Sequence, residues 1–212
     1  MMKPMSFARR TVLAAALAAP FLAAPAFAAD PAETFVNDNI QKGMAILNNK
    51  GLSKLQRRDQ FEQFLLGLAD LKRIADFTLG RYRATTSPAD LAAFDAAFQN
   101  FAVATYQSYF SKYTGQSLKV TNSTQAGPTD YRVIANVIDP NDRSGKEPLE
   151  VTFRVRTDRG KPVVTDVAVN GAFLSIAQQA QFVGFLGQNN GNVKLLIAHL
   201  ADVTADLAKS TN

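Results

Sequence analysis

The sequence predicts an α+β fold in which helices pack on one face of a curved, four-stranded antiparallel sheet. Apolar residues recur at helical spacing over residues 31–115 and again over residues 172–208. Between them, residues 117–170 alternate apolar and polar side chains and are divided by short segments rich in turn residues, which is typical of an antiparallel meander. A mature chain of this size is expected to form a single domain.

The first 28 residues have the pattern of a secretory signal peptide. Three basic residues precede a short apolar run, which ends in Ala-Phe-Ala at residues 26–28, a cleavage signature. The alternative is a membrane anchor, but a bilayer span needs about 20 apolar residues and Pro20 and Pro25 interrupt this run. We therefore expect residues 1–28 to be cleaved and residues 29–212 to form the mature domain. Arg9-Arg10 hints at twin-arginine export, but the ordinary Sec route fits the surrounding residues better.

The mature chain has little net charge and no cysteine. Removal of residues 1–28 takes three of the 23 basic residues and leaves 20 against 18 acidic ones, a net charge of +2. This balance does not favour nucleic-acid binding, which requires a clustered basic face. Because an exported chain without cysteine forms no disulfide, a hydrophobic core must hold the fold together.

The helical region before the strands has clear start signals. Ser53 is placed to cap a helix that continues through Ile74 and Phe77 and ends at Gly80. Ser87 is expected to cap the longest helix, with Pro88 at its first position and Asp90 in its first turn. This helix is predicted to run to about Gly115, which gives a length of about 39 Å.

Four strand-like runs follow, at residues 117–122, 130–139, 148–157 and 161–170. In the last run, alternation places Val163, Val167 and Val169 on one face of the sheet. Asn170-Gly171 then joins the last strand to two closing helices over residues 172–208. The sequence of this join contains no nucleophile, metal ligand or phosphate-binding loop.

Catalytic and metal sites are not predicted. His199 is the only histidine and there is no cysteine, so no metal cluster or Ser-His triad can be completed from these residue types. Asp76, Asp95 and Asp166 sit among apolar residues, where a carboxylate either forms a structural ion pair or performs acid–base chemistry. The alternative function is therefore a small hydrolase or isomerase that uses a carboxylate in a cavity. No cofactor is expected.

Three stretches carry a resemblance to a known family. They are LGRY at residues 79–82, FAVATYQSYFSKYTG at residues 101–115 and VVTDVAVNGAFLSIAQQAQF at residues 163–182. In this order they resemble the MlaC, or toluene-tolerance, family of periplasmic lipid-binding auxiliary proteins of ABC transport systems. The tail GQNNGNVKLLIAHL, at residues 187–200, is similar to the hopanoid-associated HpnM branch. The chain departs from the family pattern at Pro162 and Arg83, where aromatic residues are common, and at Gln178-Gln179, where the family often has arginine.

The resemblance implies an NTF2-like or cystatin-like sheet wrapped by helices, with a deep apolar cavity between them. It implies a non-enzymatic carrier that binds a phospholipid or a hopanoid in the periplasm. It also implies shuttling between an outer-membrane lipoprotein–porin complex, or another exporter, and an inner-membrane ABC transporter. We expect a monomer, since no feature of the sequence indicates an oligomer.

The residues expected to line the cavity are inward-facing sheet residues and aromatic residues of the helices. They are Val133, Val137, Val151, Phe153, Val167 and Val169 from the sheet, and Phe98, Phe101, Tyr106, Phe110 and Phe173 from helices. A solid core has the same pattern, so each of these residues has core packing as its alternative. Tyr82 and Arg81 are the candidates for the cavity mouth, with an ion pair to a carboxylate as the alternative role of Arg81.

Overall fold

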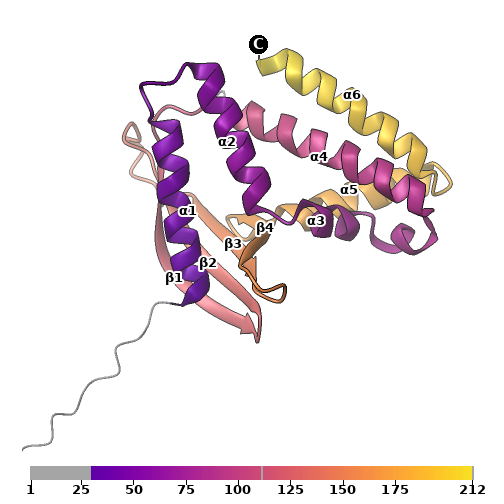
Figure 1. The fold of residues 1–212 in the computed structure, drawn as a ribbon, viewed down its shortest axis with the longest axis horizontal. Helices are drawn as coiled ribbons and strands as arrows, with labels where there is room; N and C mark the ends of the chain where they lie inside the picture. Colours follow the sequence, from indigo (N-terminus) through magenta and orange to yellow (C-terminus); the bar gives the residue numbers. More distant parts are fainter. Residues whose placement is uncertain (1–29, 111, 212) are drawn as a thin grey trace, which may run out of the picture.

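The computed structural model describes residues 30–110 and 112–211. The predicted signal peptide at residues 1–28 lies outside the described residues and stays a prediction. Figure 1 shows helices around an open sheet, with α4 and α6 running side by side. None of the helices in the described ranges is long and apolar enough to cross a bilayer.

The prediction of one helix from Ser53 to Gly80 was wrong, because the chain breaks at Ala69 and the Asp70 side chain caps a separate helix. The helices occupy the two predicted regions, before and after the strands. They are α1 (Pro31–Leu47), α2 (Lys54–Leu68), α3 (Leu71–Thr78), the 3-10 helix η1 (Gly80–Thr85), α4 (Pro88–Phe110), α5 (Leu174–Gln188) and α6 (Val193–Thr211). Ser53 and Gln56 form a reciprocal capping box at the start of α2. The Ser87 hydroxyl accepts a hydrogen bond from the Asp90 amide at 3.1 Å, which caps α4 as predicted.

The sheet contains five antiparallel strands rather than the predicted four. The strands are β1 (Ser117–Gly127), β2 (Asp130–Ile138), β3 (Glu150–Arg156), β4 (Val163–Val169) and β5 (Ala172–Phe173), paired in sequence order. The prediction was wrong at Asn170-Gly171, which forms a two-residue hairpin with positive φ values of 47° and 80°. The chain therefore adds a short strand before α5 begins at Leu174.

The interior is divided into two apolar clusters. One lies among α3, α4, α5 and α6 and includes Phe94, Phe98 and Phe182. The other lies between α1 and the sheet and includes Val36, Val133 and Val155. In Figure 1, α1 lies over β1 and β2, and α2 lies between α1 and the other helices.

Ion pairs tie the turn ends of the sheet to α3. The Arg154 guanidinium lies 2.7 Å from Oδ2 of Asp130 on β2, and the Arg73 guanidinium of α3 lies 2.9 Å from Oδ2 of Asp158. Arg159 pairs with Asp70, the N-cap of α3, at 2.8 Å. These bonds hold the β3–β4 turn against the start of α3.

Asp130→Asn is expected to destabilise the protein at neutral pH but not in acid. Hydrogen bonding from Arg154 is the largest effect on Asp130 and lowers the pKa of its carboxyl below the ordinary value. A lowered folded-state pKa contributes stability above the unfolded-state pKa of about 4, and that contribution is lost as the pH falls through the folded-state value. Urea unfolding should show that the variant has a lower free energy of unfolding than wild type at pH 7, and that this difference becomes small at pH 2. Asp206→Asn, in an exposed pair with Lys209, is the control and should change little at either pH.

Candidate functional site

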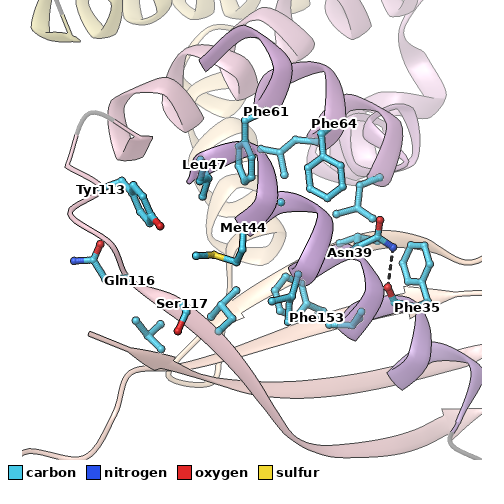
Figure 2. Close-up of a pocket in the computed structure, with 18 residues that line it drawn as sticks. Phe35, Asn39, Met44, Leu47, Phe61, Phe64, Tyr113, Gln116, Ser117 and Phe153 are labelled. Atoms are coloured by element: carbon cyan, nitrogen blue, oxygen red, sulfur yellow. Dashed lines mark hydrogen bonds between the residues drawn. The ribbon is translucent and has the colours of Figure 1, made fainter. Parts of the chain in front are cut away.

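An apolar pocket lies between α1, α2 and the inner face of the sheet. Its volume is about 260 Å³, and the atoms that face it are almost all apolar. We call it the α1–α2 pocket, and Figure 2 shows its side chains. It is lined by Phe35, Val36, Asn39, Ile40, Gly43, Met44, Leu47, Phe61, Phe64, Leu65, Leu68, Tyr113, Gln116, Ser117, Leu118, Val137, Phe153 and Val164.

Two helices form one wall because their apolar stripes face each other. On α1, Ile40, Met44 and Leu47 recur at intervals of three and four residues, so they share one face. On α2, Phe61 and Phe64 meet α1 at Gly43, where an added Cβ would lie 3.0 Å from the Phe61 ring. The absence of a side chain at Gly43 lets these rings approach the backbone of α1 closely.

The sheet supplies the opposite wall. Val137 of β2, Phe153 of β3 and Val164 of β4 line the pocket. A register shift between β3 and β4 pairs Val155 with Val164, while Phe153 pairs with Val167. The sequence predicted that Val163 shares a face with Val167 and Val169. This prediction was wrong, because the bulge turns Val164 rather than Val163 toward the inner face.

Three polar residues of the lining, Tyr113, Gln116 and Ser117, follow α4 at one end of the pocket, whereas the polar Asn39 lies beside Phe35 at the other (Figure 2). The Tyr113 hydroxyl donates to Oδ1 of Asn48 at 3.4 Å, and burial raises the pKa of that phenol. The Gln116 amide donates to Oδ2 of Asp139 at 3.0 Å. The lining contains no carboxylate, histidine or lysine, so this pocket can hold an apolar molecule but offers no acid–base pair.

Comparison with known families decides the identity. The family model of the MlaC protein matches residues 37–202 of the chain. The chain belongs to the MlaC family. Members of this family are lipid-binding carriers rather than enzymes, and they are periplasmic in general. No curated protein matches the chain.

A solved structure has the same fold as this MlaC-family chain. It is the phospholipid-binding protein from Ralstonia solanacearum in complex with a phospholipid, which aligns with a TM-score of 0.71 and 22% identity. The alignment covers 84% of this chain and 99% of that protein. At this identity the likeness establishes the shared architecture of helices on an open antiparallel sheet.

Two predicted cavity residues, Val137 and Phe153, line the α1–α2 pocket. Tyr106 and Phe110 do not line the pocket but pack against Phe61, which does. Their ring centroids lie 5.2 and 6.5 Å from that of Phe61. Burial raises the pKa of the Tyr106 phenol.

Most of the remaining predicted sheet residues share the inner face with the pocket but do not line it. Val133 is completely buried in the core against α1. The register joins Val151 to Val169 and Phe153 to Val167, so these valines lie on the same face as the pocket floor. They are half-buried.

Three predicted aromatic residues lie elsewhere. Phe98 and Phe101 pack their rings against Phe182, with centroids 6.4 and 6.3 Å away, and so belong to the helical core. Phe173 pairs with Ala168 on β4, which places it on the face opposite Val167.

The two candidates for the cavity mouth are also remote from the pocket lining. Arg81 lies 5.0 Å from the ring centroid of Tyr82 and donates to its hydroxyl at 3.0 Å. Tyr82 packs against Gly191, whose added Cβ would lie 3.1 Å from the ring. Both residues thus belong to the junction of η1 with the end of α5.

None of the residues predicted from the sequence to line the cavity lies on α1 or α2. Their helical stripes were visible, and the short polar link between the two helices predicts an antiparallel helical hairpin. Gly43 was a further signal, because a glycine inside a helical stripe often marks a close approach.

The carboxylates considered for catalysis have structural partners. Asp95 lies 3.1 Å from the Lys72 ammonium, and Asp76 pairs with both Lys72 and Arg83. Asp166 accepts hydrogen bonds from the amide and hydroxyl of Ser175. His199 is exposed and stacks on Phe185, with the ring centroids 4.8 Å apart. No group of acidic or histidine side chains within residues 30–110 and 112–211 is arranged to hold a metal ion.

Gly43→Ala and Gly67→Ala are a matched pair that tests the close approach of α2 to α1. At Gly67 an added methyl meets no atom within 4 Å, so the variant should gain up to about 1 kcal/mol from helix propensity. At Gly43 the Phe61 and Phe64 rings must shift, which costs about 1–3 kcal/mol. Urea unfolding should find Gly43→Ala less stable than Gly67→Ala by that amount. Equal stabilisation by both changes would contradict the packing described.

Proposed function

We propose that this protein carries phospholipid through the periplasm and holds the acyl portion in the α1–α2 pocket. The observation that carries the proposal is an almost wholly apolar pocket in a member of the MlaC family. The phospholipid bound by the structurally similar Ralstonia solanacearum protein supports this ligand class. The polar end near Tyr113 and Gln116 is the side on which we place the lipid headgroup.

The free energy of transfer explains why a carrier is needed. A two-tailed lipid has about 30 methylenes, and each gains about 0.8 kcal/mol on leaving water, or about 24 kcal/mol in all. Spontaneous passage through an aqueous compartment is therefore very slow. A protein that replaces water with apolar side chains over the tails removes most of this barrier without covalent chemistry.

The pocket must widen to enclose a two-tailed lipid. Its volume of about 260 Å³ lies just below the range of about 300–1,000 Å³ typical of pockets for drug-sized ligands. Helix α2 is the wall best able to move, because none of its residues is fully buried. We propose that one acyl chain enters the space already present and that displacement of α2 admits the second.

The finer features of the carrier are also proposals. Residues 29–212 act as one lipid-binding domain, released when residues 1–28 are cleaved, and work as a monomer. A hopanoid is the second ligand to consider, because the tail at residues 187–200 resembles the hopanoid-associated branch. Delivery between an outer-membrane complex and an inner-membrane ABC transporter completes the proposed role.

Native mass spectrometry of gently purified protein tests the proposal. We expect a bound species whose mass matches a phospholipid, and lipid extraction should identify its headgroup. A hopanoid in its place would change the ligand and keep the carrier function. Protein that is empty and also takes up no lipid from vesicles would refute it.

A further inference from the structure

The net positive charge of the mature chain is concentrated in one segment. Residues 39–58 contain five basic side chains and no acidic one. The rest of the mature chain, residues 29–38 and 59–212, holds 15 basic and 18 acidic residues and is therefore net negative. The five basic residues are Lys42, Lys50, Lys54, Arg57 and Arg58.

This segment forms the end of the α1–α2 hairpin, and we call residues 42–58 the α1–α2 tip. Arg57 donates to the carbonyl oxygens of Asn49 at 3.2 Å and Leu52 at 2.8 Å, which fixes the turn. The capping box at Ser53 fixes the start of α2. The tip therefore presents its lysines from an ordered backbone rather than from a loose loop.

The lysines of the tip are available to an external partner. Lys42, Lys50 and Lys54 are exposed, and none of them takes part in an ion pair within the described parts of the chain. Arg58 alone is paired, with Asp59 at 2.8 Å. Elsewhere the described structure pairs many of its cations with carboxylates, as in the network of Arg73, Arg154 and Arg159.

Apolar and aromatic side chains accompany these charges. Leu55 of the tip is 56% exposed, and Tyr109, on the last turn of α4, is 65% exposed. The hydrogen bond from Tyr113 to Asn48 brings the segment after α4 to the tip. Tyr113 and Leu47 also line the polar end of the α1–α2 pocket, so the tip and this end of the pocket are adjacent.

We propose that the α1–α2 tip docks on the surface of a bilayer that contains anionic phospholipid. Clustered lysines attract an anionic surface at about 1 kcal/mol each, which is about a fivefold change in affinity. Exposed leucine and tyrosine side chains suit the boundary between headgroups and acyl chains. Docking in this orientation brings the polar end of the pocket to the membrane, where a lipid enters or leaves. This last step rests on the proposed carrier function, whereas membrane binding by the tip does not.

Vesicle flotation with a matched pair of double variants tests the docking surface. The vesicles contain phosphatidylcholine alone or with about one-third phosphatidylglycerol, at low and high salt. Lys50→Gln/Lys54→Gln removes two charges from the tip, and Lys146→Gln/Lys161→Gln removes two exposed charges elsewhere. We expect wild-type protein to bind the anionic vesicles in a salt-sensitive way and the tip variant to bind about 30-fold more weakly. The control variant should bind like wild type.

A second matched pair of variants tests the apolar part of the docking surface. Leu55→Ser should weaken binding about fivefold, while Leu195→Ser, at a residue 46% exposed on α6, should not. Equal losses for tip and control variants would indicate a general charge effect and overturn the proposal. Absence of vesicle binding by wild-type protein would also overturn the proposal. Binding that requires a membrane protein in the vesicle would overturn it too and would assign the tip to a protein partner. Lipid content, measured in parallel by native mass spectrometry, reports on the carrier function independently, and the tip variant should keep its lipid.

Discussion

Met44→Asp is expected to leave the purified protein without lipid. Met44 lies on the α1 wall, and Figure 2 shows it among the side chains that converge on the pocket. A carboxylate here must lose water when an acyl chain enters, and burying an uncompensated charge costs several kcal/mol. Since each 1.4 kcal/mol is a factor of ten, affinity for an acyl chain should fall by more than 100-fold.

Ala45→Asp is the control for this change, because it places the same carboxylate on the exposed side of the same helix. Met44→Leu keeps the volume and apolar character and should retain lipid. Native mass spectrometry gives the lipid content, and circular dichroism with thermal unfolding shows whether each variant is folded. A folded Met44→Asp protein with the lipid content of wild type would place the ligand outside the α1–α2 pocket.

The starts of α2 and α4 and four of the strands were predictable because each is specified by local signals. Ser53 and Ser87 cap helices by accepting bonds from amides three residues away, so nearby sequence determines where α2 and α4 begin. The fifth strand was not predicted because Ala172–Phe173 has only two residues, which is too few to show an alternating pattern of apolar and polar side chains. Asn170-Gly171 did carry a signal, since this pair favours the hairpin turn that the chain adopts.

The site was only partly predictable, because periodicity identifies an apolar face but not the element that covers it. Phe98 and Phe101 form a stripe on α4 much like that of Ile40 and Met44 on α1. The first stripe is filled by Phe182 from α5, and the second faces the pocket. This difference depends on tertiary packing of segments far apart in the chain, which a single sequence does not reveal.

The corner between β4 and α5 is held by a buried carboxylate. Asp166 is 6% exposed and accepts hydrogen bonds from the amide of Val167 at 2.9 Å and from the amide and hydroxyl of Ser175 at 3.1 and 2.5 Å. Ser175, also 6% exposed, lies in the first turn of α5. An acid at the start of a helix is further stabilised by the helix dipole. The join between the predicted last strand and the helix that follows it thus depends on one charged residue for its geometry.

Asp166→Ala is expected to lower the free energy of unfolding by about 3–5 kcal/mol, because it leaves the buried amide and hydroxyl of Ser175 without their acceptor. For a chain of this size the loss corresponds to a fall in Tm of about 6–20 °C. Ser175→Ala removes only the hydroxyl bond and should cost less, about 1–3 kcal/mol. Urea unfolding of both single variants and the double variant gives the coupling between the two side chains, which should be at least about 1 kcal/mol since they are in direct contact. Additive losses would mean that the two residues act separately, and the carboxylate would then not be what fixes the first turn of α5.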